Sequence, residues 1–262
     1  RLAEYALFKD ASETLKTMDD VGRFYRAPAV MKVNTSWKLD GVSFDVERGT
    51  LFSLLGVNGA GKTTTIRLLT GLLRPDGGHA EICGYPAGST DAARLIGLSP
   101  QETSTAGNLT VRENLIMTAK IYGFRDAAAR ADDIIGRLGM GEFAGRKSKH
   151  LSGGLRRRLS IGMGIVTEPK VLFLDEPTLG LDVIARRELW TFLEELKKSV
   201  TVVLTTHYME EAEALSDKIA VMANGAVKAS GTLAELRTVS GSAAGERLEN
   251  VFLRLAEGGE RR

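Results

Sequence analysis

The apolar residues of the chain follow two periods, which predict strands in some segments and helices in others. Short apolar or alternating runs bounded by turn residues are typical of strands. We expect strands at residues 42–46, 51–55, 80–83, 96–98, 171–174, 200–205, 218–222 and 227–229. Apolar residues three and four positions apart predict helices at about 65–69, 110–122, 127–138, 152–166, 186–198, 209–215 and 248–255. This order of strands and helices predicts an α/β fold with a mostly parallel sheet.

The order of these elements divides the chain into three parts. Residues 1–36 show no clean period and form a poorly defined N-terminal segment. Residues 37–231 contain the predicted sheet, interrupted between about 102 and 165 by an inserted helical subdomain. Residues 232–262 form a short helical tail. The Asn224-Gly225 pair favours a hairpin, so a small part of the β structure is expected to be antiparallel.

A glycine-rich segment joins the strand at 51–55 to the next helix. Residues 56–63 fit the pattern G-x-x-x-x-G-K-[ST] of a phosphate-binding (P-loop) segment. Its glycines allow backbone N–H groups to converge on phosphate oxygens, and the helix N-terminus adds the positive end of its dipole. Lys62 can reach the β- and γ-phosphates, and the Thr63 hydroxyl can bind Mg²⁺. The residues expected to bind the phosphates are Gly56, Asn58, Gly59, Gly61, Lys62, Thr63 and Thr64.

Two adjacent carboxylates end the apolar strand at 171–174. Asp175 can hold the Mg²⁺ that bridges the β- and γ-phosphates. Glu176 can orient or deprotonate an attacking water. Alone, such a pair of carboxylates is an exposed acidic turn as often as it is a functional site. Downstream of a phosphate-binding loop, it predicts a centre for nucleotide hydrolysis.

Further polar residues are candidates for the same site only because the chain also contains the phosphate-binding loop and the carboxylate pair. Ser152, Gly153 and Gly154 form a second glycine-rich helix start that can bind an anion. By itself such a start is more often an ordinary helix cap. Gln101, in a loop, can bind a metal or sense the γ-phosphate. His207 follows a predicted strand, where its imidazole can donate a hydrogen bond to a γ-phosphate oxygen.

Composition narrows the class of protein. Hydrophobic residues make up 43% of the 262, which is typical of a globular core. The 35 basic and 33 acidic residues lack the basic excess that a nucleic-acid partner would favour. The single cysteine, Cys83, fits a reducing compartment. No apolar run approaches the roughly 18–20 residues needed to cross a bilayer, and no signal peptide is visible. We therefore expect a cytoplasmic protein without a nucleic-acid partner.

Six motifs together resemble those of the nucleotide-binding subunit of ATP-binding cassette (ABC) transporters. The resemblance extends from about residue 42 to residue 231. In the family's order, the motifs are the Walker A loop (56–63), the Q-loop (Gln101), the LSGGQ motif (151–155), Walker B with its catalytic Glu (171–176), the D-loop (179–182) and the switch histidine (His207). The resemblance implies that ATP and Mg²⁺ are the cofactors. It places Thr63, Gln101 and Asp175 at the metal, and Lys62, Glu176 and His207 in catalysis.

The resemblance also implies two partners. Two copies of the subunit would pair head to tail, with each ATP between the Walker A loop of one copy and the Ser152 loop of the other. Asp182 could cap the following helix or lie in a contact between the copies. A separate integral membrane permease would hold the subunit at the inner face of the cell membrane.

The chain departs from the family pattern at two points. Leu155 replaces the usual Gln of LSGGQ, which removes a side-chain amide but leaves the Ser152 hydroxyl and the backbone donors. The aromatic residue that stacks on adenine is Tyr25 or Trp37, and the neighbours of Tyr25 favour it.

Three consecutive arginines, 156–158, begin the helix after the LSGGQ-like motif. Positive charge there opposes the helix dipole. A nucleotide role is one interpretation, and a solvated or salt-bridged face is the favoured one.

The C-terminal part helps to distinguish subfamilies. Residues 231–236 and 248–253 look like the short C-terminus of ABC-2-type exporter ATPases, which serve drug and sodium export. Export through an ABC-2-type permease is therefore the favoured function. An ABC importer subunit and an ABC ATPase acting on ribosomes or DNA are the alternatives. A regulatory module that binds ATP without hydrolysing it is disfavoured by Glu176 and His207.

Overall fold

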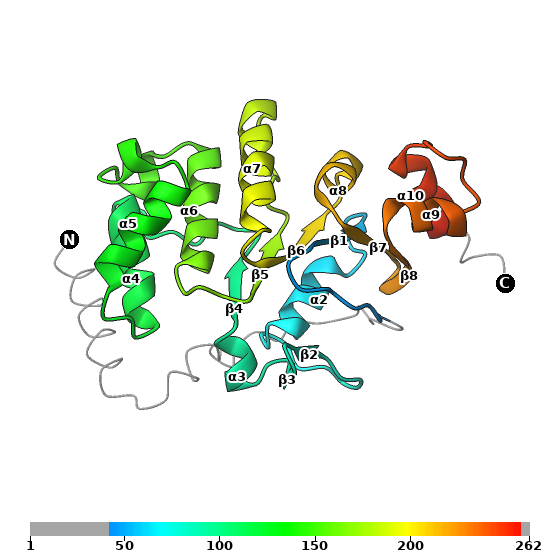
Figure 1. Ribbon diagram of the computed structural model, residues 1–262, viewed down its shortest axis with the longest axis horizontal. Coiled ribbons are helices and arrows are strands. Elements are labelled where there is room, and N and C mark those ends of the chain that lie inside the picture. The colour runs from blue at the N-terminus through cyan, green and yellow to red at the C-terminus, as the bar shows by residue number, and fades with distance from the viewer. Residues whose placement is uncertain (1–41, 258–262) are drawn as a thin grey trace.

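The computed structural model describes residues 42–257 and has a six-stranded sheet at its centre (Figure 1). The strand order is β4 (Ile96–Ser99), β5 (Val171–Asp175), β6 (Thr201–Thr206), β1 (Leu51–Gly56), β7 (Lys218–Ala223) and β8 (Ala226–Gly231). Neighbouring strands are parallel except β7 and β8, which form an antiparallel hairpin. The predicted α/β fold with a mostly parallel sheet is confirmed.

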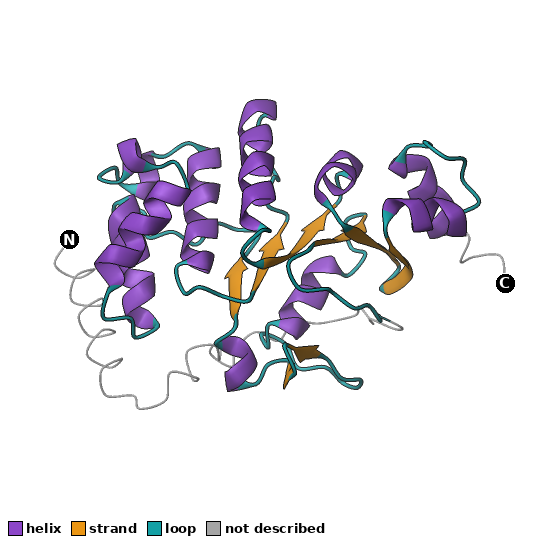
Figure 2. Ribbon diagram, in the orientation of Figure 1, coloured by secondary structure: helices purple, strands orange, loops and turns teal. Residues whose placement is uncertain are grey.

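Helices cover both faces of the sheet, which explains why the central strands β1 and β6 are buried along their whole length (Figure 2). Alternate residues of each strand enter different cores. Leu51 and Val202 pack in the core that includes residues of α7, whereas Phe52 and Val203 pack with Ile66 of α2. The covering helices are α7 (Val183–Leu196) and α8 (Met209–Leu215) on one face and α2 (Lys62–Leu69) on the other.

Three helices gather beyond the β4 edge of the sheet (Figure 1). They are α4 (Val111–Ile121), α5 (Ala127–Arg137) and α6 (Gly153–Ile165), with short 3-10 turns at Gly141–Phe143 and Ser148–His150. The predicted capping box of Thr110 and Glu113 begins α4. α6 packs closely on β4, where a Cβ atom at Gly97 would collide with the carbonyl of Gly164. This close approach positions the N-terminus of α6 relative to the sheet.

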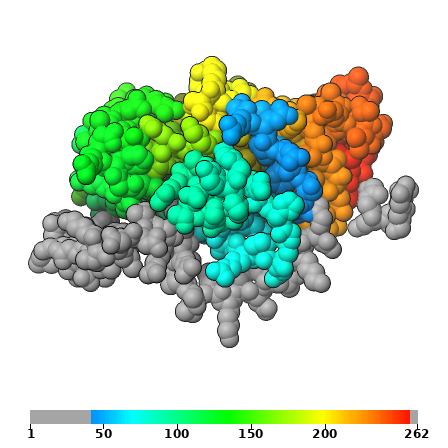
Figure 3. Space-filling model, turned by 60° about the horizontal axis from the view of Figure 1, so that its bottom comes forward, coloured from blue at the N-terminus to red at the C-terminus, as the bar shows by residue number. Residues whose placement is uncertain are grey.

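Two smaller units complete the described residues. A two-stranded sheet of β2 (Glu81–Ile82) and β3 (Tyr85–Pro86), followed by α3 (Thr90–Ala93), lies on the α2 side. Figure 3 shows this segment (cyan) between the α4–α5 region (green) and the C-terminal helices. These C-terminal helices are α9 (Leu233–Val239) and α10 (Leu248–Glu257), which pack with β7, β8 and α8. None of the helices in residues 42–257 is both long and apolar enough to cross a membrane.

The predicted strand at 42–46 is wrong. Val42, Phe44 and Val46 do alternate between half-buried and exposed neighbours, and the Phe44 ring stacks on Phe52 at 5.0 Å. The segment pairs with no strand among the described residues. Its alternation therefore reflects packing on one surface rather than membership of a sheet. The sequence also missed β3 and α3, which are only two and four residues long.

Candidate nucleotide-binding site

The loop between β1 and α2 has the backbone conformation that phosphate binding needs. Gly59 and Gly61 have φ angles of 83° and 104°, which few other residues adopt. A Cβ atom at Gly56 would come within 2.6 Å of the Met222 carbonyl oxygen. No side chain caps the start of α2. The first N–H groups of this helix are therefore available to an anion, assisted by the helix dipole.

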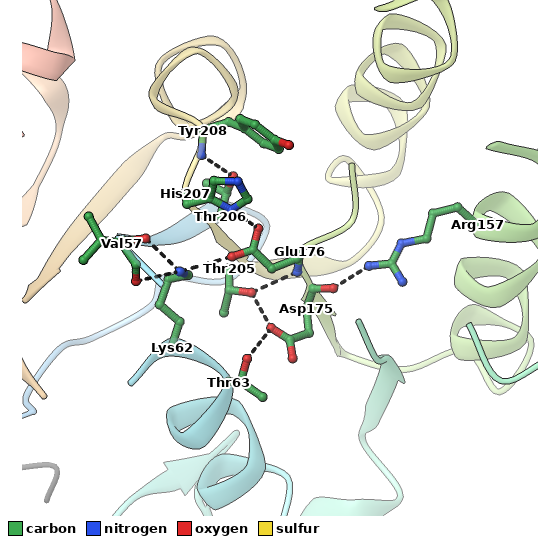
Figure 4. Close-up of polar contacts among 11 residues, drawn as sticks. Val57, Lys62, Thr63, Arg157, Asp175, Glu176, Thr205, Thr206, His207 and Tyr208 are labelled. Carbon is green, nitrogen blue, oxygen red and sulfur yellow. Dashed lines mark hydrogen bonds and ion pairs between the residues drawn. The ribbon is translucent and has the colours of Figure 1, made fainter. Parts of the chain in front are cut away.

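Lys62 lies at the centre of this loop and is only 5% exposed. Its Nζ donates hydrogen bonds to the carbonyl oxygens of Gly56 (2.7 Å) and Val57 (3.2 Å). The same Nζ lies 3.1 Å from Oε1 of Glu176 (Figure 4). A buried ammonium is costly unless it is paired and hydrogen-bonded. These contacts satisfy that requirement and fix the ammonium beside the loop.

Asp175 ends β5 next to Thr63. The Thr63 hydroxyl donates to Oδ1 of Asp175 at 3.1 Å, and the Thr205 hydroxyl donates to the same oxygen at 2.6 Å. Neighbouring ligands of octahedral Mg²⁺, with bonds near 2.1 Å, lie about 3.0 Å apart. The spacing of the Thr63 and Asp175 oxygens therefore fits a magnesium site. None of the described residues forms a cluster of three or more His, Cys, Asp or Glu side chains suited to a metal, and Mg²⁺ in nucleotide sites takes its other ligands from phosphates and water.

Glu176 turns its side chain away from that of Asp175. Its φ angle is 47°, in the left-handed region that is uncommon for residues other than glycine. The carboxylate is 6% exposed and has separate partners for its two oxygens. Oε1 pairs with Lys62, and Oε2 lies 2.8 Å from Nδ1 of His207. The two carboxylates thus lie in different places, Asp175 beside Thr63 and Glu176 beside Lys62.

His207 follows β6 and is supported from one side by an aromatic ring. Its imidazole lies 4.1 Å from the Tyr208 ring centre, and the guanidinium of Arg186 lies 4.5 Å from the same Tyr208 ring. The backbone N–H of Tyr208 donates to the Thr206 hydroxyl at 3.0 Å. These contacts fix the turn that presents the imidazole to Glu176.

The structure brings together five of the predicted side chains and leaves others apart. Lys62, Glu176 and His207 make one set of polar contacts, and Thr63 and Asp175 make another. Thr205 bonds to both Asp175 and Glu176 and so joins the two sets into one cluster (Figure 4). Within the described residues, no hydrogen bond joins this cluster to the side chains of the other candidates. Gln101 is exposed, and Ser152, Gly153 and Gly154 lie at the start of α6. The Ser152 hydroxyl accepts from the Leu155 N–H at 3.3 Å, so it caps its own helix. Tyr25 and Trp37 lie outside the described residues.

The sequence pattern of the family described as "ABC transporter" matches residues 39–179, more than half of the chain. The chain belongs to the ABC transporter family. It is 44% identical over 80% of its length to the daunorubicin/doxorubicin resistance ATP-binding protein DrrA of Streptomyces peucetius. It is 43% identical over 71% of its length to the Nod factor export ATP-binding protein I of Burkholderia pseudomallei. The chain spans 65% and 63% of the lengths of these two relatives.

A solved structure supports the same assignment. It is a dimeric post-hydrolysis state of an ATP-binding cassette with bound ADP and phosphate, 25% identical to this chain. The alignment has a TM-score of 0.66 and covers 74% of this chain and 90% of that chain. The fold described above is therefore that of an ATP-binding cassette.

Arg157 was missed by the sequence analysis, which favoured a solvated or salt-bridged face for 156–158. Arg158 does pair with Glu188, at 2.6 Å. Arg157 instead is 4% exposed and reaches into the cassette. Its guanidinium donates to the carbonyl oxygens of Pro100, Gln101, Asp175 and Pro177. Helical spacing was the available signal, because Arg157 lies four and eight positions before the buried Ile161 and Ile165 of α6.

The four carbonyls keep the Arg157 guanidinium charged although it is buried. Burial lowers the pKa of Arg157 to about 10, and the nearby carboxylates of Asp175, Glu211 and Glu176 oppose that shift. This pKa is still well above neutral pH. The cation therefore joins α6 to the loop after β4 and to the end of β5.

We expect Arg157→Met to lower the free energy of unfolding by about 2–4 kcal/mol, because buried carbonyls lose a charged donor. Urea denaturation measures this change. Arg156→Met is the matched control, since the Arg156 side chain makes no hydrogen bond among the described residues. Equal effects of the two substitutions would show that the buried contacts of Arg157 contribute little.

Glu211, on α8, is a buried carboxylate close to the site, with 0% exposure. Its Oε1 accepts a hydrogen bond from Nε1 of Trp190 at 3.2 Å. Burial raises the pKa of Glu211, an effect that the Trp190 donor opposes and the charge of Glu176 reinforces. A raised pKa in the folded state favours the protonated form. The corresponding stability is present at low pH and is lost as the pH rises through the folded-state pKa.

We therefore expect Glu211→Gln to stabilise the protein relative to wild type increasingly as the pH rises from the ordinary pKa of a glutamate, about 4.3, through the raised folded-state pKa of Glu211. The gain is on the order of 1 kcal/mol for each unit by which burial raises the pKa. The amide oxygen of Gln can still accept from Trp190. Urea denaturation at a series of pH values measures the difference, with Glu210→Gln as the exposed control. Parallel pH profiles for wild type and Glu211→Gln would contradict this role of burial.

Proposed function

We propose that this ATP-binding cassette hydrolyses ATP with Mg²⁺ and that hydrolysis drives export through a separate membrane permease. The observation that carries the proposal is the placement of Glu176. Its carboxylate lies between the lysine of the phosphate-binding loop and an imidazole, at 3.1 Å and 2.8 Å. A general base must lie within hydrogen-bonding reach of the proton that it abstracts, here one on a water next to the terminal phosphate. A module that only holds ATP has no need for such a buried carboxylate.

Each residue of the cluster has a proposed task in this reaction. Lys62 and the N–H groups of the loop bind the phosphates, and Thr63 and Asp175 hold Mg²⁺, with Gln101 approaching from its loop. Bound Mg²⁺ supplies positive charge at the β- and γ-phosphate oxygens. Glu176 orients and deprotonates the attacking water, and His207 donates to a γ-phosphate oxygen. No covalent intermediate is needed, because phosphoryl transfer depends mainly on positioning and charge stabilisation.

We further propose that the active form is a head-to-tail dimer. Residues 42–257 contain two glycine-rich helix starts suited to anions, at α2 and α6, but one nucleotide cluster. A second copy would bring its Ser152, Gly153 and Gly154 to that cluster. An exposed apolar patch supports this arrangement. It comprises Leu179, Val183 and Ile184, which are 43%, 66% and 72% exposed.

The patch lies close to the second helix start. The Gly153 Cα faces Leu181, and a Cβ atom at Gly154 would come 3.0 Å from the Cβ atom of Ala185. Exposed apolar patches of this kind mark protein–protein contacts. Asp182, in the same segment, caps α7, where its Oδ1 accepts from the N–H groups of Ile184 and Ala185, both at 2.9 Å.

Export is the proposed direction, and an ABC-2-type permease the proposed membrane partner. The relative named for Nod factor export and the relative named for drug resistance support this choice. Through the permease the chain would lie at the inner face of the cell membrane.

The ATP-hydrolysing step is tested by measuring phosphate release from the purified chain with ATP, with and without Mg²⁺. The transport assignment is tested by purifying the chain with its partners from native membranes. A six-span permease is the expected partner, whereas ribosomal activation or a periplasmic binding protein would contradict export.

A further inference from the structure

Thr205 lies between the two carboxylate residues of the site. It is the fifth residue of β6 and is fully buried. In the sheet it pairs with Asp175 of β5 on one side and with Leu54 of β1 on the other. No sequence pattern marks Thr205 for a special role, because a β-branched residue is expected in a central strand.

The Thr205 hydroxyl makes two hydrogen bonds, one to each carboxylate residue (Figure 4). It donates to Oδ1 of Asp175 at 2.6 Å and accepts from the backbone N–H of Glu176 at 2.9 Å. The carbonyl oxygen of Thr205 also accepts from the same N–H, at 3.2 Å. A hydroxyl has one donor and two acceptor sites, so both bonds can form together. Valine has the same shape but can make neither of them.

The first bond orients the side chain that is proposed to hold Mg²⁺. Thr63 and Thr205 both donate to Oδ1 of Asp175. Oδ2 accepts no hydrogen bond from the residues that the structure describes. The hydroxyl pair therefore fixes the orientation of the carboxylate next to Thr63, the other residue proposed to hold Mg²⁺.

The second bond supports an unfavourable backbone conformation. The left-handed φ angle of Glu176 costs on the order of 1 kcal/mol or more for a residue other than glycine. Such a conformation persists where its surroundings fix it. Here the Glu176 N–H has two acceptors, both from Thr205. That conformation sends the carboxylate toward Lys62 and His207.

The other threonines of β6 make different contacts. The Thr206 hydroxyl accepts from Tyr208 N–H, and the Thr201 hydroxyl accepts from Gly49 N–H at 3.0 Å. Thr201 lies at the opposite end of the strand from the nucleotide cluster. It therefore offers a matched control, a buried strand threonine whose hydroxyl makes one hydrogen bond away from the site.

We propose that Thr205 is a positioning residue for ATP hydrolysis, whose hydroxyl fixes the metal-binding carboxylate of Asp175 and the backbone of the catalytic Glu176 together. The inference rests on the proposed function. Thr205 touches neither nucleotide nor metal and acts through the two residues that do. Loss of its hydroxyl should raise the Mg²⁺ concentration that hydrolysis needs and should slow hydrolysis. Nucleotide binding without metal should be unchanged.

The test compares Thr205→Val, Thr205→Ser and Thr201→Val in steady-state hydrolysis with titrated Mg²⁺. Thr205→Val should lower kcat about 10- to 100-fold, since small misplacements of catalytic groups have effects of this size. It should also raise the Mg²⁺ concentration for half-maximal rate. Binding of a fluorescent ATP analogue in EDTA should be unchanged. Thr205→Ser should restore most of kcat and the Mg²⁺ dependence, and Thr201→Val should change neither.

Two results would overturn the proposal. One is a folded Thr205→Val protein with wild-type kcat and Mg²⁺ dependence. The other is a Thr205→Ser protein as impaired as Thr205→Val, which would assign the effect to packing of the threonine methyl group. Circular dichroism and urea denaturation establish folding. Absence of hydrolysis by the wild-type chain would instead contradict the proposed function itself, so the two failures are distinguishable.

Discussion

Replacement of Glu176 by glutamine should abolish nearly all ATP hydrolysis while leaving ATP binding intact. The amide has the shape of the carboxylate but cannot accept a proton from water. Loss of a positioned general base typically costs about 10²- to 10⁴-fold in rate. Removing this charge also frees Lys62 from its ion pair, so binding of ATP should be as tight as in wild type or tighter. Phosphate release and equilibrium binding of a fluorescent ATP analogue measure the two effects.

The same variant should accumulate as an ATP-dependent dimer, because ATP closes the dimer and hydrolysis reopens it in the proposed cycle. Size-exclusion chromatography with and without ATP detects this change. Glu210→Gln serves as the control, since Glu210 is exposed and makes no side-chain contact with the cluster. Near-normal turnover by Glu176→Gln would remove Glu176 from its proposed role.

Lys62→Ala and Ser152→Asp should each be inactive alone, and their mixture should regain activity. Lys62→Ala loses the ammonium that binds the phosphates. Ser152→Asp keeps a good helix cap for α6 but places a negative charge where the partner's γ-phosphate would lie. In a head-to-tail dimer, a mixed pair has one site with both changes and one site with neither. Free exchange of subunits makes about half of the dimers mixed, so about a quarter of the wild-type activity should return.

This complementation distinguishes a shared site from a self-contained one. Ser152→Ala is the mild control, because it removes the hydroxyl without adding charge. If each chain used only its own Ser152, the mixture would be as inactive as its two components. Phosphate release from equimolar mixtures, after incubation that permits exchange, gives the answer.

The sequence predicted the parts of the site that depend on local spacing. The glycines before Lys62 and the carboxylates after an apolar strand each occupy one short segment, so their patterns were visible directly. Parallel strands then bring the carboxyl ends of β1, β5 and β6 to the same edge of the sheet. That is why Lys62, Glu176 and His207 meet, although 145 positions separate the first from the last in the numbering.

The contacts that the sequence did not reveal join segments through atoms that carry no motif. Arg157 binds backbone carbonyls, which every residue has, so nothing in the sequences of the two acceptor loops identified them as its partners. Thr205 is of a residue type that is common in strands, so its hydrogen bonds could not be predicted from the sequence. The left-handed conformation of Glu176 is likewise fixed by hydrogen bonds across strands rather than by its own side chain. The prediction of a strand at 42–46 was wrong because an alternating pattern shows which side chains are buried. It does not show whether the backbone pairs with another strand.

Arg157 links three segments of the cassette through one side chain. Its guanidinium holds α6, the loop at Gln101 and the end of β5 at Asp175 through direct hydrogen bonds. A rotation of α6 that carried Ser152 toward a second copy would pull on the same bonds. In the proposed dimer, the approach of one copy to its neighbour's ATP would then displace the residues of its own proposed magnesium site. A single buried cation would thereby couple the two proposed nucleotide sites.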